Sequence, residues 1–217
     1  MPVYEPSDDS YLLSESIKEY LESIESIINQ NNKAEQTNNK SNQHPSSLKF
    51  HNISDIHNDF KILDMGSGSG IQAETCRALG FNNILVTDIN QEAIKLLKNK
   101  GFKTKKSNLF SNLAKKNNFN LIVFNPPYLP EDKNEPKESR ISTTAGKKGY
   151  ELIIKFLKQA KPYLYKQGII LLLISSLTNP KIIQKTAGEL GYDCKIINKK
   201  KLFFEELYVY GLRFLKN

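Results

Sequence analysis

Apolar side chains near the N-terminus recur at the spacing of one face of a helix. The recurring residues are Leu13, Ile17, Tyr20, Leu21, Ile24, Ile27 and Ile28. Ser7 stands before this run and is followed directly by Asp8 and Asp9. A serine can cap the first free N–H groups of a helix, and the helix dipole favours acidic side chains in the first turn. The pattern predicts a long amphipathic helix that begins at Ser7.

From residue 60 onwards, short apolar runs alternate with segments of helical spacing. The expected strands are residues 61–65, 83–87, 102–106, 119–124, 169–175, 193–197 and 203–214, and the expected helices are residues 71–79, 92–100, 149–165 and 180–190. Strands that alternate with helices favour a mostly parallel sheet with helices on both faces. The last two strands are joined through Lys199, Lys200 and Lys201, which predicts an antiparallel hairpin at one edge. We therefore expect an α/β fold with a seven-stranded sheet.

A polar segment separates the first helix from the first strand. Residues 29–43 contain nine Asn or Gln residues, and Ala34 has their only aliphatic side chain. Such a segment has too little apolar surface to offset the entropy of ordering it, so it is expected to be disordered. We assign residues 29–58 as a low-complexity insertion within one domain that covers residues 1–217, a length typical of a single domain.

The net charge of +8 and the pI of about 9.2 are compatible with two interpretations. A net positive charge favours association with polyanions such as RNA or ribosomes. A solvated surface rich in Lys and Asn would give the same balance, and no stripe of Arg and aromatic residues marks a nucleic-acid platform. The charge alone therefore leaves both open.

The cysteine, histidine and hydropathy patterns bear on three questions: the redox compartment, metal binding and membrane insertion. Cys76 and Cys194 are far apart and form no C-x-x-C motif, which favours a reduced cytoplasmic protein. His44, His51 and His57 lie in one polar stretch without Cys or carboxylate partners at ligand spacing, so no metal site is predicted. We expect no membrane span and no signal peptide, because no apolar run is long enough and the N-terminus lacks their pattern.

A glycine-rich turn at residues 64–70 follows the first expected strand and opens a helix. Ligands of open α/β sheets bind at the carboxyl ends of strands, and glycines let the backbone approach them closely. The turn is not a nucleotide P-loop, because Ile71 rather than lysine follows Gly70, and a dinucleotide fingerprint would place the third glycine one residue later. Asp88 ends the next strand, where a carboxylate can accept hydrogen bonds from ribose hydroxyls.

The tetrapeptide Asn125, Pro126, Pro127 and Tyr128 ends the apolar strand at residues 119–124. The side-chain oxygen of Asn125 and the backbone carbonyl of Pro126 can accept the two N–H bonds of a planar NH2 group. The two prolines have fixed φ angles, which preorganises both acceptors. Tyr128 can lay its ring against the flat group and exclude water. The tetrapeptide therefore predicts a site that positions a planar NH2 nitrogen.

Together, these two motifs resemble class I methyltransferases, in which [DNS]-P-P-[YF] marks enzymes that act on planar nitrogens. The resemblance implies a single Rossmann-like domain and S-adenosylmethionine as cofactor. The methyl group of this cofactor is already activated as a sulfonium, so positioning would supply most of the catalysis without a metal or a strong base. An Asp that often contacts the adenine amino group in this fold is replaced by Asn108, which can accept the same hydrogen bond without a charge.

The block Y-E-P-x-[ED]-D-[ST], present as residues 4–10, narrows the resemblance. With T-D-I-N at residues 87–90 and an A-G-G-x-x-G-like run at residues 145–149, where Lys147 replaces a glycine, it resembles the archaeal and eukaryotic branch of HemK-like methyltransferases. That branch modifies the glutamine of the Gly-Gly-Gln loop in class 1 release factors. The implied cofactor-binding residues are Ser10, Asp64, Gly66, Gly68, Asp88, Asn108, Leu109 and Asn125. The implied substrate-binding residues are Asn125, Pro126, Pro127 and Tyr128, of which Asn125, Pro126 and Tyr128 would be catalytic.

The resemblance also implies a partner. Members of this branch usually work with a small zinc-binding activator subunit that adds a strand beside the third strand, here residues 102–106. The lysines of this strand would discourage most strand addition, although an acidic partner edge could accept them.

Two other functions remain open from the sequence. An adenine N6-methyltransferase acting on DNA or RNA would use the same tetrapeptide, because adenine also presents a planar NH2 group. The chain has no room for a separate target-recognition domain, which makes this reading less favoured. A scaffold that only binds cofactor or partner would not need Asn125 and Asp88.

Overall fold

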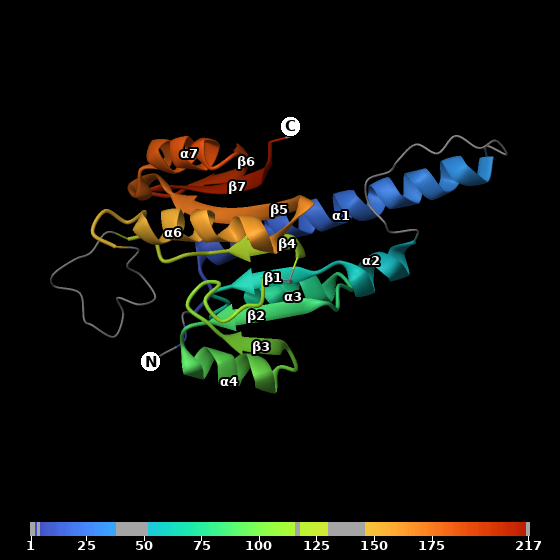
Figure 1. Cartoon of the computed structure of the whole chain (residues 1–217), viewed down its shortest axis with the longest axis horizontal. Helices are drawn as coiled ribbons and strands as arrows, with labels where there is room; N and C mark the ends of the chain where they lie inside the picture. Colours follow the sequence, from blue (N-terminus) through green and yellow to red (C-terminus); the bar gives the residue numbers. More distant parts are fainter. Residues whose placement is uncertain (1–2, 4, 38–51, 116–117, 130–145, 216–217) are drawn as a thin grey trace.

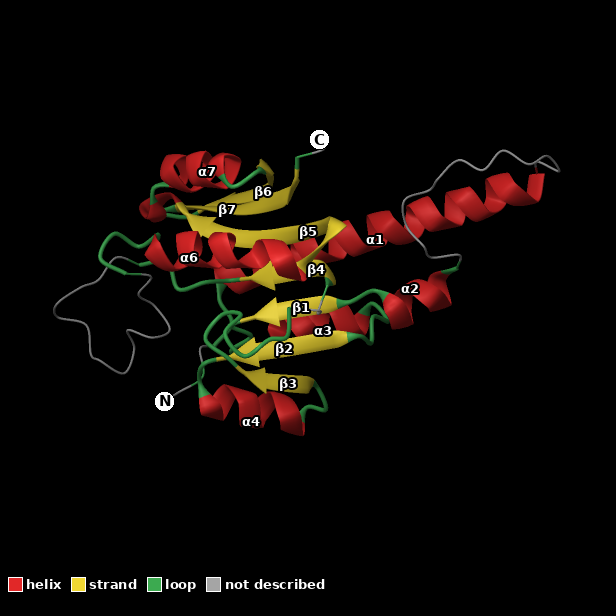
Figure 2. Ribbon diagram, in the orientation of Figure 1, coloured by secondary structure: helices red, strands yellow, loops and turns green. Residues whose placement is uncertain are grey.

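The computed structural model describes residues 3, 5–37, 52–115, 118–129 and 146–215, which form one seven-stranded sheet flanked by helices (Figures 1 and 2). The strands are β1 (Ile62–Met65), β2 (Ile84–Asp88), β3 (Lys103–Lys106), β4 (Phe119–Phe124), β5 (Leu164–Ser175), β6 (Tyr192–Lys201) and β7 (Glu206–Phe214). Their order is β3-β2-β1-β4-β5-β7-β6. The pairs from β3 to β5 are parallel, whereas β7 is antiparallel to both β5 and β6. The predicted fold class is confirmed.

Helices cover both faces of this sheet. They are α1 (Asp8–Thr37), α2 (Ile53–Asp59), α3 (Ile71–Ala78), α4 (Gln91–Asn99), α6 (Glu151–Ala160) and α7 (Pro180–Glu189), with 3-10 turns η1 (Lys161–Tyr163) and η2 (Ser176–Thr178). One core cluster contains buried residues of α1, α2 and α3, and a second cluster contains those of α6 and α7. In the described part of the chain, no helix combines the length and the apolar character needed to cross a bilayer.

Burial on both faces of the sheet explains why the sequence of β4 is apolar at nearly every position. Leu121 and Val123 belong to the core cluster under α1 and α3, whereas Ile122 and Phe124 belong to the cluster under α6 and α7. Successive side chains of a strand point to opposite faces, so a strand covered on both sides has no polar face. This burial holds the end of β4, and the tetrapeptide after it, in a fixed place.

Part of the expected insertion is helical. Helix α1 continues to Thr37, so the expectation of disorder was wrong for residues 29–37, and α2 occupies residues 53–59. Once a helix is nucleated, each further residue adds a hydrogen bond that roughly offsets the entropy lost in fixing its backbone. Helix α2 is held by Ile56, which is fully buried, and by an Asn52 cap. Residues 38–51 lie outside the described residues.

Several further expected boundaries were wrong in the C-terminal half. The helix predicted over residues 149–165 ends at Ala160, because Pro162 lacks an N–H group and its ring opposes a continuing helix. Strand β5 accordingly starts early, at Leu164. The lysines expected to connect the last two strands lie inside β6, which reaches Lys201, and residues 202–205 make the turn.

Candidate active site

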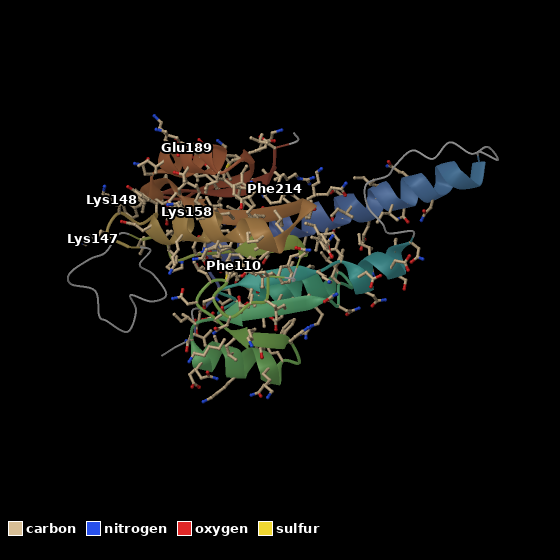
Figure 3. The ribbon with its side chains drawn as sticks, in the orientation of Figure 1. Phe110, Lys147, Lys148, Lys158, Glu189 and Phe214 are labelled. Carbon is tan, nitrogen blue, oxygen red and sulfur yellow. The ribbon has the colours of Figure 1, made fainter. Side chains whose placement is uncertain are left out.

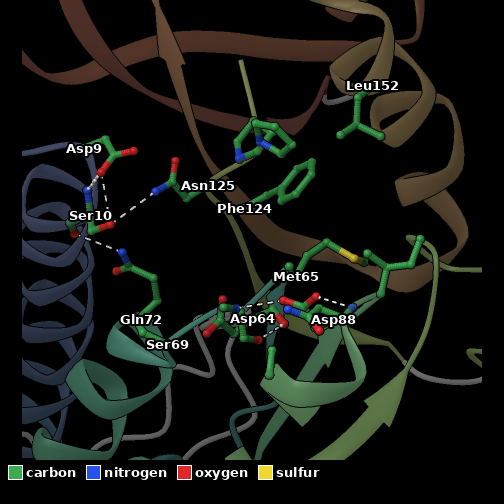
Figure 4. A pocket seen from close by; sticks show the side chains of 18 of the residues that line it. Asp9, Ser10, Asp64, Met65, Ser69, Gln72, Asp88, Phe124, Asn125 and Leu152 are labelled. Atoms are coloured by element: carbon green, nitrogen blue, oxygen red, sulfur yellow. Dashed lines mark hydrogen bonds between the residues drawn. The ribbon is translucent and has the colours of Figure 1, made fainter. Parts of the chain in front are cut away.

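A cavity of about 430 Å³ lies at the carboxyl ends of β1, β2 and β4 (Figure 4). The structure brings every predicted site residue into its lining. These residues are Ser10, Asp64, Gly66, Gly68, Asp88, Asn108, Leu109, Asn125, Pro126, Pro127 and Tyr128. They come from five separate segments of the chain, and parallel pairing of β1 with both β2 and β4 brings the strand ends together. The cavity therefore brings these polar groups together at the carboxyl ends of the parallel strands.

The glycine-rich loop turns through left-handed backbone conformations that favour glycine. Gly66 has φ +63° and Gly68 has φ +51°. A Cβ atom on Gly66 would lie 3.4 Å from the Phe124 ring, at the cavity wall. The backbone N–H of Gly68 donates to Asp88 Oδ2 at 2.9 Å, and that of Asn90 donates to Asp88 Oδ1 at 2.7 Å. Asp88 is thus fixed by two loops, with carboxylate lone pairs left to accept from a ligand.

Two buried carboxyl groups give the cavity an acidic end. Burial raises the pKa of Asp64 from 3.8 to about 7, hydrogen bonds from Ser67 and Ala73 oppose the rise, and the nearby Asp88 adds to it. Burial also raises the pKa of Asp88, against the backbone N–H groups that it accepts. A cationic ligand group placed here would favour both ionised forms.

The Asn125 side chain presents an unused acceptor to the cavity. Its Nδ2 donates to Ser10 Oγ at 3.5 Å, and this contact turns the amide nitrogen toward α1 (Figure 4). Its Oδ1 is buried and has no hydrogen-bond partner among the described residues. Buried polar atoms are nearly always paired, so an unpaired oxygen in a cavity wall indicates that a ligand donates to it. Pro126, with no N–H group, is buried beside it.

A buried polar network that the sequence analysis missed ties α1 to α3. Gln72 Nε2 donates to the backbone oxygen of Ser10 at 2.9 Å, and Ser14 Oγ donates to Gln72 Oε1 at 2.9 Å. Thr75 Oγ1 donates in turn to Ser14 Oγ at 3.2 Å. The network fixes the place of Ser10, and through it the amide of Asn125. The signal was available: Ser10 and Ser14 are four residues apart, next to the apolar stripe of the helix.

Apolar side chains and two more acids, Asp9 and Glu205, complete the lining. Met65, Ile89, Leu109, Phe124 and Leu152 contribute the apolar part of the wall. Leu109 has φ +51°, an uncommon conformation for a non-glycine residue that concentrates at functional sites. The Oγ of Ser107 donates to the backbone oxygen of Leu109 at 2.6 Å and holds this turn.

The described part of the run at residues 145–149, residues 146–149, does not line the cavity. Gly146 and Gly149 have positive φ angles and form a turn before α6, and Lys147 and Lys148 lie at the surface there (Figure 3). The backbone N–H of Lys148 donates to the Glu151 side chain, which closes this turn. Ala145 and Tyr4, which belong to the quoted motifs, lie outside the described residues, as do His44 and His51.

Comparison with known proteins identifies the family. The model of the methyltransferase small domain family matches residues 46–203. A Methanocaldococcus jannaschii protein with the provisional name protein N5-glutamine methyltransferase is 35% identical over 170 residues, which cover 75% of this chain and 85% of that protein. A release factor glutamine methyltransferase of Pasteurella multocida is 32% identical over 140 residues, covering 54% of this chain and 46% of its own.

Solved structures share the fold. The E. cuniculi structure described as an Mtq2-Trm112 complex responsible for methylation of the eRF1 translation termination factor matches 99% of this chain and 100% of its own, with a TM-score of 0.68 and 22% identity. A Bacteroides fragilis S-adenosylmethionine-dependent methyltransferase in complex with S-adenosyl-L-homocysteine matches 72% of this chain and 73% of its own, with a TM-score of 0.52 and 19% identity. The chain therefore belongs to the methyltransferase small domain family and is an S-adenosylmethionine-dependent methyltransferase.

Proposed function

We propose that this enzyme methylates the side-chain amide nitrogen of a glutamine, in the Gly-Gly-Gln loop of a class 1 release factor. The observation that carries the proposal is the unpaired Asn125 Oδ1 in the cavity wall, beside Pro126. The names of the M. jannaschii and P. multocida relatives support the choice of glutamine. Because translation terminates in the cytoplasm, we place the enzyme there, with residues 1–217 acting as one domain.

The cavity fits S-adenosylmethionine by the chemistry of its groups. Asp88, held by the N–H groups of Gly68 and Asn90, would accept from the ribose hydroxyls. Asp64, whose buried carboxyl lies at the acidic end, would face the cationic amino-acid part of the cofactor. Leu109 and Asn108 would bound the adenine, with Asn108 able to accept from its amino group. Bound there, the cofactor supplies a methyl group on an electrophilic sulfonium.

The tetrapeptide would position the nitrogen that receives this methyl group. An amide nitrogen is a weak nucleophile, because its lone pair is delocalised into the carbonyl group. Asn125 Oδ1 would accept one of its N–H bonds and the Pro126 carbonyl oxygen the other, which fixes the direction of the lone pair. The half-buried Tyr128 ring would cover the flat amide and keep water out.

Ser10 would act as a positioning residue in this arrangement. By accepting from Asn125 Nδ2, it selects which end of the amide faces the cavity, so the oxygen is the end offered to a donor. Gln72 and Asp9 hold Ser10 through its backbone oxygen and its N–H group. The start of α1 therefore contributes to orientation of the substrate as well as to the cavity wall.

Transfer of labelled methyl groups tests the choice of substrate. The enzyme would be incubated with labelled S-adenosylmethionine and either a class 1 release factor or DNA and RNA. We expect label in the release factor only, and mass spectrometry should place it on the glutamine of the Gly-Gly-Gln loop. Label found in nucleic acid alone would instead identify an adenine N6-methyltransferase, and label in neither would favour a binding protein.

We also propose that a small zinc-binding activator adds a strand along β3. Among the described strands, β3 pairs with β2 alone and lies at one edge of the sheet, with Lys103, Lys105 and Lys106 exposed. An acidic partner strand would both complete the unpaired backbone and neutralise these lysines. Size-exclusion chromatography of the chain co-expressed with its activator should give one peak, and two separate peaks would exclude the complex.

A further inference from the structure

The turn between β6 and β7 exposes two neighbouring aromatic side chains, Phe203 and Phe204, which we call the aromatic tip. Their exposed fractions are 93% and 86%, the largest among the exposed apolar side chains of the described residues. The two rings pack edge to face, with centroids 4.7 Å apart and an angle of 80° between their planes. An exposed apolar cluster of this kind indicates a site of interaction.

The aromatic tip is anchored at the rim of the active-site cavity. The backbone N–H of Leu202 donates to the Glu205 backbone oxygen at 2.8 Å, which closes the turn. The Glu205 side chain lines the cavity and accepts a hydrogen bond from Ser175, at the end of β5. Leu202 packs against the same core cluster as Tyr128 of the tetrapeptide. The tip is therefore directly joined in sequence to Glu205, a residue that lines the cavity.

Ion pairs beside the aromatic tip also connect it to the start of α1. Lys200 Nζ lies 2.8 Å from Asp8 Oδ1, and Asp8 is two residues before Ser10 of the cavity wall. Lys199 Nζ lies 3.3 Å from Glu206 Oε1. These contacts neutralise two of the lysines that precede the tip, so it does not offer the concentrated positive charge that phosphate groups attract.

A further exposed apolar side chain lies on a neighbouring element. Leu177 of η2 is 49% exposed, and η2 is joined to the start of β7 by a hydrogen bond from the Glu206 N–H to Ser176 Oγ at 3.0 Å. Aromatic side chains that carry a neutral, apolar surface are typical anchors of protein interfaces. A protein surface with apolar side chains thus matches the tip better than a nucleic acid does.

We infer that the aromatic tip docks the folded protein substrate, by receiving an apolar patch on the domain that carries the target glutamine. This inference rests on the proposed function, since it assumes a protein substrate. The docked patch would lie beside the cavity mouth, and the glutamine loop would reach past Glu205 to Asn125. The tip would then contribute to capture of the substrate and not to the chemical step.

Steady-state kinetics with an intact class 1 release factor test the inference, with the Phe203→Ser/Phe204→Ser double variant. We expect KM for the release factor to rise about ten-fold or more, with kcat at saturation and the affinity for S-adenosylmethionine unchanged. Ile27→Ser is the matched control, because Ile27 is 49% exposed on α1 outside the cavity lining, and it should leave KM unchanged. Thermal melts of both variants would verify that they fold.

Each outcome separates docking from the proposed function. If the wild-type enzyme methylates the release factor and the double variant keeps the wild-type KM, the tip does not dock the substrate, although the proposed function stands. If the wild-type enzyme modifies no release factor, the proposed function fails and the inference fails with it. A wild-type dimer that the double variant converts to a monomer, with KM unaltered, would make the tip a contact between copies of this chain.

Discussion

At the scale of the residue, the side-chain oxygen of Asn125 would serve to position the substrate, whereas other residues would bind the cofactor. Under the proposed function, Asn125 Oδ1 would orient the amide of the substrate, whereas Asp64, Asp88 and the glycine loop would contact the cofactor. Loss of one preorganised hydrogen-bonding group in an active site typically costs about 100- to 1,000-fold in kcat. We expect Asn125→Ala to lose activity to this extent, with an unchanged dissociation constant for S-adenosylmethionine measured by calorimetry.

The control for this variant is Asn58→Ala, since Asn58 is exposed on α2 and its amide donates to the Ser54 backbone oxygen, away from the cavity lining. It should keep wild-type activity. Full methyl transfer by Asn125→Ala would exclude the proposed role of the oxygen.

A second prediction at this scale concerns pH and Asp64. Because burial raises its pKa to about 7, a cationic cofactor group must displace a proton from Asp64 at or below neutral pH. We expect the affinity for S-adenosylmethionine to weaken as the pH falls from 8 to 6, and calorimetry in two buffers of different ionisation enthalpy should detect proton release. Asp64→Asn should bind weakly at every pH in this window. An affinity that is constant from pH 6 to 8 in the wild type would contradict the assignment.

The same group sets the sign of a stability effect without cofactor. A carboxyl whose folded pKa is raised stabilises the fold fully below its ordinary pKa of 3.8, and this contribution is lost as the pH rises through 7. The Asp64→Asn variant should therefore gain stability over the wild type at pH 8, measured by urea denaturation.

The sequence predicted the lining of the cavity because its chemistry is local. Asn125 to Tyr128 and the glycine loop are contiguous motifs that follow strands, so their places needed only the sheet order. Gln72 and Glu205 were missed, because each becomes part of the site through contacts between segments far apart in the chain. Neither has a local pattern that distinguishes it from a surface residue.

At the scale of the element, Gly70 joins the cofactor loop to α3. It has φ +88°, and an added Cβ would lie 2.4 Å from Leu97 Cδ2, which is fully buried on α4. Gly70→Ala should lower the free energy of unfolding by about 1–3 kcal/mol for the backbone strain, and by a similar amount for the overpacking. Urea denaturation measures the sum.

Gly101→Ala separates the two contributions. Gly101 has φ +81°, but a Cβ there would meet nothing within 4 Å, so this variant should lose stability through strain alone. Equal losses in the two variants would show that Leu97 moves aside without cost.

Element types followed from periodicity, whereas several boundaries depended on contacts that the pattern does not encode. The continuous apolar runs of β4 and β5 reflect burial on both faces and could be recognised directly from the sequence. Pro162 was a local signal for the end of α6 that the helical spacing concealed. By contrast, residues 29–37 have a composition that favours disorder, and they are helical as the continuation of α1, whereas α2 is held by the burial of Ile56.

At the scale of the whole molecule, the two edges of the sheet present different side chains to a partner. The β6 edge is followed by the aromatic tip, and β3 at the opposite edge carries exposed lysines. If an acidic activator strand docks on β3, Lys103→Glu/Lys105→Glu should abolish co-elution with the activator. Lys155→Glu/Lys158→Glu, an equal change in charge on exposed positions of α6, should leave it intact. Retained co-elution of the β3 variant would place the partner elsewhere.

The lysines of β3 also govern how copies of the enzyme meet one another. An open strand edge invites pairing with an identical edge, but two such edges would bring Lys103, Lys105 and Lys106 of each copy into mutual repulsion. The lysines therefore oppose pairing of β3 with the β3 strand of a second copy, while an acidic strand can still pair with this edge. Salt weakens this selectivity by charge, since the Debye length shortens from about 10 Å at 0.1 M salt to about 3 Å at 1 M. Concentrated salt would then both loosen the intended complex and permit self-association, so this surface is most selective in dilute electrolyte.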